Sequence, residues 1–279
     1  MKDSCIIAPI HSPDFQRYGL DWVRTYDDYF EDNDIFLIFS NEGERDNFEQ
    51  LASSTIGKRQ NKNKYNSIVC EEPLLQSPIT QKKFYGLKHI FENTQFKRVG
   101  VVDVDTIFLK NIDYDRMFEE SISNGKIYAS HTGRFAFINE SSLKFFNGED
   151  QKIIKNLTQN SSLYFWFNDI PVYSREHYLN FLKYIDYENK IGLAQWHDFD
   201  FIMYAYYLLT QQIAELVPIK IKDVIPTTIG SFIENQHLTN PPDFEKIVRE
   251  IRPMWLKYEI NPSAMDSVFM RLHIHSPHK

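Results

Sequence analysis

The chain has few cysteines, no excess of positive charge and no long apolar run. Cys5 and Cys70 are the only cysteines among 279 residues, and their apolar, strand-like surroundings predict free buried thiols of a reducing compartment. The formal net charge is −7 at pH 7, which disfavours a nucleic-acid binder. No run is long enough to cross a bilayer, and MKDSCIIAPI lacks the features of a secretory signal. We therefore expect a cytoplasmic protein.

One basic segment stands out against this acidic background. Residues 58–64 read KRQNKNK. Such a run is usually a solvated loop, but it leaves open a contact with an acidic partner or an anionic membrane surface. The second contact would place the protein at the inner face of the membrane.

The composition is sufficient for a sizeable core. Hydrophobic residues make up 42% of the chain and aromatic residues 15%, which excludes a disordered polypeptide. The length suits one large α/β domain or two small ones. Because no linker or composition boundary is evident, we expect a single domain, residues 1–279.

Short apolar segments alternate with helical patterns in the first part of the chain. This alternation predicts a mixed, mostly parallel sheet flanked by helices, an α/β fold. Beyond residue 125 the pattern is less regular. The predicted strands are 4–10, 35–39, 68–70, 99–102, 126–129, 163–167 and 268–274. The predicted helices follow Asp14 and Ser77-Pro78 and cover 43–53, 174–184 and 199–209.

Two aspartates follow the strand 99–102, in the segment VGVVDVDTIFL. In open α/β sheets, ligands bind beyond the carboxyl ends of the strands. Asp103 and Asp105 would repel each other there unless a cation or hydrogen-bond donors compensated their charge. A divalent ion with oxygen ligands is the natural compensator, often together with phosphate oxygens. The alternative is a simple turn.

The region SPITQKKFYGLKHIFENTQFKRVGVVDVDTIFL, residues 77–109, resembles nucleotide-sugar glycosyltransferases of the GT-A fold. The resemblance implies a single Rossmann-like domain with a nucleotide-binding half to about residue 110 and an acceptor-binding half, about 111–279. It implies Mn²⁺ or Mg²⁺ as cofactor and a nucleotide-diphosphate sugar, with a UDP-sugar expected, as donor. Asp103 would face the ribose or the metal, and Asp105 would bind the metal.

Further donor contacts follow from the same resemblance. SCIIAPIHSPDF, residues 4–15, is similar to the start of such domains, where the loop after the first strand holds the base. This implies nucleotide contacts by Pro9, His11 and Asp14. On the helix before the aspartate pair, Lys83 or one of its neighbours Gln81 and Lys82 would reach the nucleotide, with an exposed helix face as the alternative.

The chain ends in a histidine-rich segment, RLHIHSPHK, residues 271–279. Its His-x-x-Ser-x-x-Lys spacing is similar to the His-x-x-Gly-x-x-Lys of the glycogenin-like family, with Ser276 in place of glycine. The resemblance implies that His273 binds the metal and Lys279 the diphosphate. His275 alternates with His273 along a strand, so either histidine could be the ligand.

The segment WHDFDFIMYAYY, residues 196–207, offers two candidate catalytic carboxylates, Asp198 and Asp200. Glycosyl transfer with inversion needs a general base near the acceptor hydroxyl, and Asp200 resembles such a position in some bacterial GT-A enzymes. The alternative for either residue is a helix cap. Because the terminal histidines suggest a retaining relative, the stereochemistry stays open.

The favoured hypothesis is a metal-dependent glycosyltransferase that acts on a glycan or lipid-linked acceptor, in surface polysaccharide or lipid-linked glycan synthesis. One alternative is a phosphohydrolase of the haloacid-dehalogenase type, whose signature is also a strand ending in Asp-x-Asp. That signature prefers Thr or Val where this chain has Ile107. The other alternative is a protein that binds a nucleotide or glycan without catalysis. The oligomeric state is not predicted.

Overall fold

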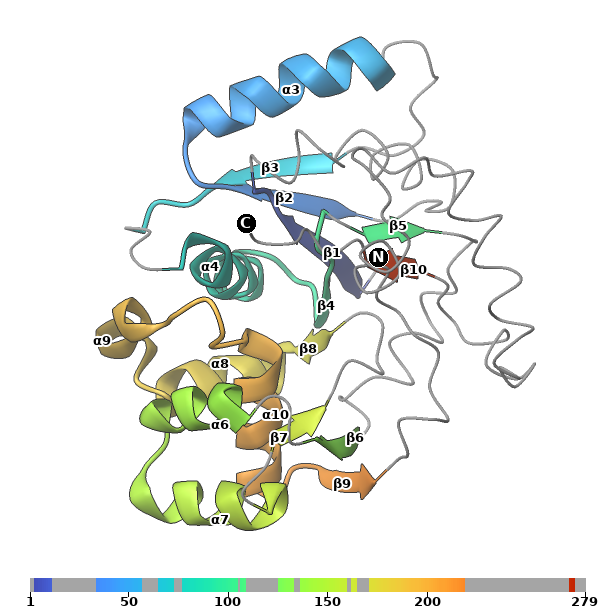
Figure 1. Cartoon of the computed structure of the whole chain (residues 1–279). Helices are drawn as coiled ribbons and strands as arrows, with labels where there is room; N and C mark the ends of the chain where they lie inside the picture. Colours follow the sequence, from blue (N-terminus) through green and yellow to red (C-terminus); the bar gives the residue numbers. More distant parts are fainter. Residues whose placement is uncertain are drawn as a thin grey trace, which may run out of the picture.

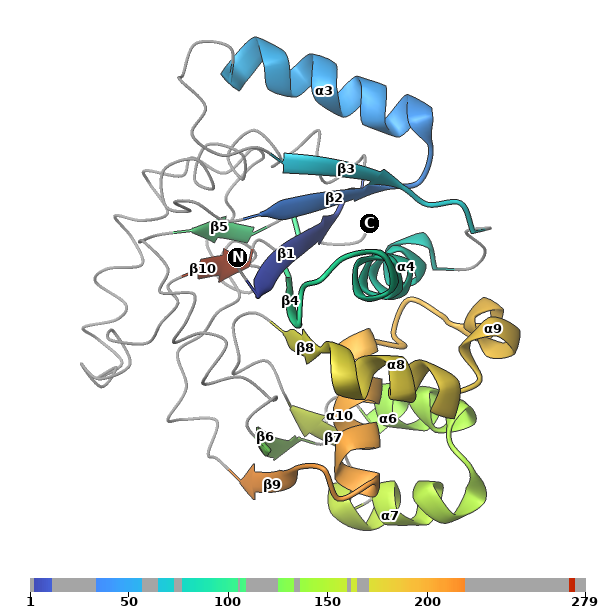
Figure 2. The same cartoon turned by 180° about the vertical axis from the view of Figure 1, so that it is seen from behind.

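The computed structural model describes residues 3–11, 34–56, 65–72, 77–104, 106–108, 125–132, 136–159, 162–164, 171–218 and 271–273. Figures 1 and 2 show the arrangement of its elements from opposite sides. The strands are β1 (Ser4–Pro9), β2 (Ile35–Phe39), β3 (Tyr65–Val69), β4 (Arg98–Val101), β5 (Thr106–Phe108), β6 (Lys126–Thr132), β7 (Ser162–Tyr164), β8 (Val172–Ser174), β9 (Glu215–Pro218) and β10 (Arg271–His273). The helices are α3 (Glu42–Ile56), α4 (Pro78–Asn93), α6 (Ala136–Ser142), α7 (Gly148–Thr158), α8 (Arg175–Tyr184), α9 (Tyr187–Lys190) and α10 (Asp200–Thr210), with 3₁₀ turns η3 (Leu143–Phe145) and η4 (Ile191–Leu193).

A five-stranded sheet in the order β3-β2-β1-β4-β8 forms the centre of the molecule. The first four strands are parallel, and β8 pairs antiparallel with β4. Two small sheets have the orders β10-β5 and β7-β6-β9. The predicted mixed, mostly parallel sheet is therefore confirmed.

Helices cover both faces of this sheet. Phe48 of α3 packs edge-on against Phe39 of β2, with ring centroids 5.4 Å apart. The preceding residue of β2, Ile38, faces α4 instead. Because successive side chains of a strand point to opposite faces, α3 and α4 lie on opposite sides of the sheet.

Gly86 allows α4 to approach the sheet closely. A Cβ at this position would lie 2.8 Å from Ile38 Cγ1 and 3.2 Å from Ile7 Cδ1. A glycine within a helix costs about 1 kcal/mol relative to alanine, whereas forcing extra atoms into a packed core costs about 1–3 kcal/mol. The glycine therefore serves the packing that holds the amino-terminal turns of α4 beside the strand ends.

The second part of the chain packs against the first through α4. Helices α8 and α10 both contact it, and in Figure 1 they lie with α6 and α7 beyond β8. Arg175, the first residue of α8, donates to the carbonyl groups of Phe91, Thr94 and Phe96 at the end of α4. This cation satisfies carbonyls that a helix end leaves unpaired.

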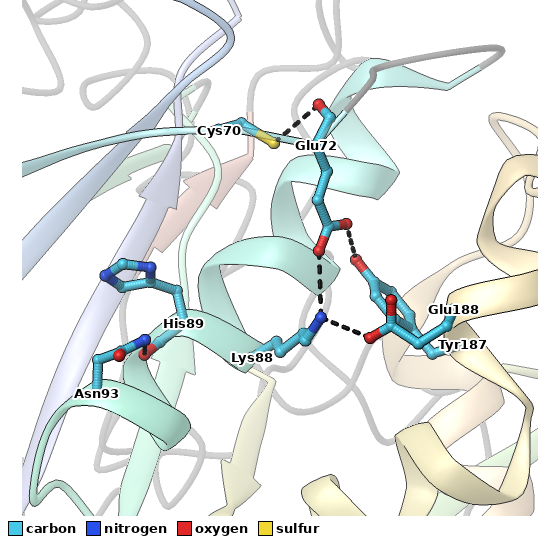
Figure 3. Close-up of polar contacts among 7 residues, drawn as sticks. All are labelled: Cys70, Glu72, Lys88, His89, Asn93, Tyr187 and Glu188. Atoms are coloured by element: carbon cyan, nitrogen blue, oxygen red, sulfur yellow. Dashed lines mark hydrogen bonds and ion pairs between the residues drawn. The ribbon is translucent and has the colours of Figure 1, made fainter.

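A polar cluster around Lys88, made of Glu72, Lys88, Tyr187 and Glu188, adds a second link (Figure 3). Lys88 Nζ lies 2.6 Å from Glu188 Oε1 and 3.3 Å from Glu72 Oε1. The Tyr187 hydroxyl donates to Glu72 Oε2 at 2.6 Å. The Lys88 cluster thus joins the segment after β3 to α4 and α9.

The structure differs from the sequence prediction mainly in short elements. The third strand was predicted over 68–70 but covers Tyr65–Val69, because its polar residues Asn66 and Ser67 pair with β2 at an edge of the sheet. Elements α6, α7, β8 and β9 were not predicted. The helix expected after Asp14 lies outside the described residues. Among the described helices, none is both long and apolar enough to span a membrane.

Candidate functional site

The site lies where the chain connections diverge at the carboxyl edge of the sheet. From β1 the chain goes to β2 and β3 on one side, whereas β4 lies on the other side of β1. Ligands of open α/β sheets bind in the crevice at such a switch point. Ile10 and His11 follow β1, and Val102 and Asp103 follow β4. Two of the predicted contact residues, His11 and Asp103, thus follow the two neighbouring strands at this switch point.

Pro9 and His11 differ in exposure. Pro9 is buried as the last residue of β1 and pairs with Ile38. The Ile10 amide donates to the Ile38 carbonyl at 2.8 Å, which extends the ladder by one residue. His11 is half-buried beyond that point. Within 3–11, His11 is therefore the better placed of the two for a ligand contact.

Lys83 and Asp103 form an ion pair across this edge. Lys83 Nζ lies 2.8 Å from Asp103 Oδ1, and the side chains are 13% and 35% exposed. Lys83 reaches this point from the amino-terminal part of α4, which begins with Pro78 after Ser77, as predicted. The amino end of a helix carries a partial positive charge that favours anions. The pair therefore brings a partly desolvated cation and a carboxylate to the carboxyl end of β4.

Asp200 belongs to the same electrostatic group. It is 2% exposed at the first position of α10, and the Tyr173 hydroxyl donates to its Oδ2 atom. Burial raises the pKa of Asp200, the Lys83 ammonium and the Tyr173 hydroxyl act to lower this pKa, and Asp103 raises it further. The Lys83 ammonium thus pairs with Asp103 and also acts electrostatically on Asp200, which comes from a separate segment.

The raised pKa of Asp200 predicts a pH-dependent stability. Its usual value is 3.8, and the fold favours the protonated form, so ionisation lowers the free energy of unfolding as the pH rises above that value. Asp200→Asn stays neutral, so its stability relative to the parent protein should increase as the pH is raised above 3.8, as measured by urea denaturation. Asp3→Asn should show a nearly constant difference over this range, because Lys97 lowers the pKa of exposed Asp3 and this carboxyl is ionised in both states above the usual value of 3.8. A pH-independent difference for Asp200→Asn would contradict the assignment.

Asp198, the other predicted catalytic carboxylate, has a different set of partners. It is 0% exposed. Its oxygens accept from Lys144 Nζ at 2.5 Å, Ser141 Oγ at 2.6 Å and the Gln195 amide at 2.8 Å. These contacts anchor the segment before α10 to α6 and η3. The catalytic role of Asp198 stays a prediction, and its partners indicate an anchoring role.

The terminal strand β10 lies beside the segment that follows the aspartate pair. His273 is opposite Thr106 in the antiparallel pairing of β10 with β5, and these strands lie side by side in both views of the molecule (Figures 1 and 2). Segments far apart in the sequence are therefore brought to the same place, as a shared metal site would require. Asp14, Asp105, His275 and Lys279 lie outside the described residues.

The carboxylate and imidazole groups predicted for this edge are chemically suitable ligands for a divalent cation. Carboxylate oxygens and imidazole are ligands of Mn²⁺, and carboxylates suit Mg²⁺. Asp103 presents a partly exposed carboxylate at this edge, and the β10 backbone passes beside β5. Within the described part of the chain, no three His, Cys, Asp or Glu side chains are grouped to hold a metal. A site here thus needs Asp105 or the terminal histidines.

An exposed aromatic pair connects α6 with the segment that leads to Asp200. Trp196 is 59% and Phe137 44% exposed, with ring centroids 6.1 Å apart. Leu193 is 54% exposed nearby in sequence. Exposed apolar groups in contact often mark a binding surface, and flat aromatic rings suit the apolar faces of sugars.

The roles of three residues of this region, as partners of Asp198 and Asp200, were not predicted from the sequence. Tyr173 lies in a strand of three residues, too short to show a period of two. Lys144 and Ser141, the partners of Asp198, are 54 and 57 positions away from it. No local pattern connects such residues. For Tyr173, the proline that precedes β8, Pro171, is the local signal that could have marked the start of a strand.

Neither a protein-family model nor any curated protein matches the chain. Among solved structures, it is similar to apo mouse xyloside xylosyltransferase 1, with 9% identity, 84% of this chain and 90% of that chain covered, and a TM-score of 0.48. It is also similar to the galactosyltransferase LgtC in complex with donor and acceptor sugar analogues, with 11% identity, 98% and 88% covered, and a TM-score of 0.48.

A third similar structure is the glycosyltransferase GlyE of Streptococcus pneumoniae TIGR4, with 10% identity and a TM-score of 0.46. The match covers 99% of this chain but 55% of GlyE. At such identities the likeness concerns the course of the chain, so residue roles are interpreted from this chain's own contacts.

Proposed function

We propose that this chain is a metal-dependent glycosyltransferase that moves a sugar from a nucleotide-diphosphate sugar to a hydroxyl of a glycan or lipid-linked acceptor. The observation that supports the proposal most is the group of Lys83, Asp103 and Asp200 beside the switch point of the sheet. A switch point of this kind suits a nucleotide, and a lysine paired with a carboxylate suits a ligand that carries both phosphate and metal.

Each residue of the group has a proposed task. A divalent cation held by Asp103 and Asp105, with His273 or His275, would neutralise the leaving diphosphate. Lys83 adds a second positive charge at the same edge. Asp103 holds the Lys83 ammonium at this edge through an ion pair of 2.8 Å. The proposed donor contacts of His11 and Asp14, and of Lys279 at the other end of the chain, complete the nucleotide side.

Asp200 acts in this proposal chiefly through Lys83. At 2% exposure and with one oxygen bound by Tyr173, its carboxylate does not face an incoming acceptor. A general base has to come within hydrogen-bond reach of the hydroxyl that it deprotonates. A product with inverted configuration would therefore indicate that Asp200 becomes exposed during the reaction. A product with retained configuration would agree with the buried position of Asp200.

The acceptor side is proposed at the surface of Trp196 and Phe137. This surface belongs in part to the segment that ends at Asp200, the first residue of α10. Sugar rings stack on aromatic faces, which contribute a large apolar area with little loss of side-chain freedom. An acceptor sugar bound there would lie on the second half of the chain, away from the loop after β1.

A thermal-shift screen with nucleotide sugars tests the function. We expect a UDP-sugar to raise the melting temperature in the presence of Mn²⁺ and to do so much less with chelator, because the cation links protein and diphosphate. Turnover is then measured with glycan acceptors. Hydrolysis of a simple phosphate ester without any donor binding would favour the phosphohydrolase. Donor binding without transfer to any acceptor would favour the non-catalytic protein.

A further inference from the structure

Two consecutive lysines of α4 contact the chain directly after two neighbouring strands of the sheet. Lys83 pairs with Asp103, which follows β4. Lys82 is 1% exposed, and its ammonium donates to the carbonyl group of Ile10, which follows β1. Because β1 and β4 are neighbours at the switch point, one helical turn holds both strand ends.

Lys82 also connects the end of β2 to this arrangement. Its Nζ atom lies 3.4 Å from Glu44 Oε2, and the Glu44 side chain is 10% exposed. The same carboxylate oxygen accepts the amide of Ser40 at 2.5 Å. Glu44 stands in the first turn of α3. The ammonium thus joins the residues that follow β1 and β2 to the first turns of α3 and α4.

The position of this charge is costly for a purely structural link. Burial lowers the pKa of Lys82, whereas Glu44 and Cys70 raise it. A buried ion pair is often no more stabilising than apolar residues of similar volume. What an apolar residue cannot supply is a donor for the Ile10 carbonyl, which lies beyond the last paired residue of β1, Pro9.

We propose that Lys82 is a positioning residue that fixes Ile10 and His11 on the β1 side of the switch point, so that a nucleotide meets a preformed loop. The identity of the ligand, a nucleotide, rests on the proposed function. It assigns the adjacent lysines different tasks: Lys83 faces the ligand, and Lys82 holds the backbone that faces it. Preorganisation of this kind lowers the entropic cost of binding.

The test uses the double variant Lys82→Met/Glu44→Gln, compared with Glu44→Gln. Lys82→Met by itself would leave the Glu44 carboxylate buried without its cation. The double variant removes both charges of this ion pair, and the glutamine oxygen can still accept the Ser40 amide. The Ile10 carbonyl loses its charged donor only in the double variant.

The first measurement is the affinity for UDP with Mg²⁺, by titration calorimetry. We expect the double variant to bind UDP about tenfold more weakly than Glu44→Gln, while the KM for the acceptor changes less than twofold. Equal UDP affinity in both variants would overturn the proposal. A weaker UDP affinity accompanied by an equal rise in the KM for the acceptor would also overturn it. If the double variant does not fold, Lys82→Arg replaces it, because the wider planar guanidinium cannot occupy the lysine's place unchanged. We again expect weaker UDP binding with little change in the KM for the acceptor.

The second measurement needs no ligand. Hydrogen exchange at the amides of Ile10 and His11 should be faster in the double variant than in Glu44→Gln, with β3 unchanged. Unchanged exchange at these amides would overturn the proposal. If the parent protein binds neither UDP nor GDP, the proposed function fails, and the exchange experiment still decides whether Lys82 fixes the loop.

Discussion

Lys83→Met is expected to lower kcat/KM about 10²- to 10³-fold, the range seen when a preorganised charge-stabilising donor is removed. In the parent protein the Lys83 ammonium lies 2.8 Å from Asp103 and also acts on Asp200. Without this ammonium, the Asp103 carboxylate loses its cation at the edge where the diphosphate is proposed to bind. Steady-state kinetics with the donor identified by the thermal-shift screen would measure the loss.

The matched control is Lys88→Met on the same helix. Lys88 also pairs with two carboxylates, Glu72 and Glu188, but within the Lys88 cluster (Figure 3) rather than at the switch point. Glu188 is 72% exposed, so the pair contributes about 1 kcal/mol or less. We expect activity within twofold of the parent protein. An equal loss of activity in both variants would mean that the lysines act through the stability of α4.

The fold was predictable where the sequence has strong periodic signals. Residues 4–9 and 35–39 are apolar runs that form buried central strands, and Ser77-Pro78 marks the start of α4. The three-residue strand β8 was not predictable, because it is defined by its pairing with β4 rather than by a pattern of its own. Local propensity has little influence on elements this short.

The candidate site was predictable in its members but not in its connections. Asp103 was selected from its place after a strand and Lys83 and Asp200 with the help of the resemblance, and the fold brings the three residues into one electrostatic group. The bond from Tyr173 to Asp200 and the different partners of Asp198 depend on contacts between distant segments. The sequence also could not distinguish Lys82 from Lys83, because adjacent helical residues differ by about 100° in direction, which only packing relates to the sheet.

Asp103→Asn is expected to reduce metal-dependent turnover about a thousandfold. The asparagine keeps the size of the side chain but removes the charge that pairs with Lys83 at 2.8 Å and that a divalent cation requires. Asp105→Ala is expected to have at least as large an effect. The measurement is the initial rate as a function of Mn²⁺ concentration, with circular dichroism to verify folding.

Asp3→Asn is the matched control for this change. The Mn²⁺ titration distinguishes a role of Asp103 in binding the cation from a role in holding Lys83. Asp3 pairs with Lys97 at 2.7 Å near the amino end of β1, so it has the same kind of partner at the opposite edge of the same sheet. We expect Asp3→Asn to retain the parent rate and metal response.

If Asp103 binds the cation, the Mn²⁺ concentration for half-activation rises in Asp103→Asn. If Asp103 serves only to hold Lys83, that concentration is unchanged while kcat falls. Parent-like activity and metal response in both Asp103→Asn and Asp105→Ala would refute a cation site at this edge of the sheet, and with it the metal-dependent mechanism.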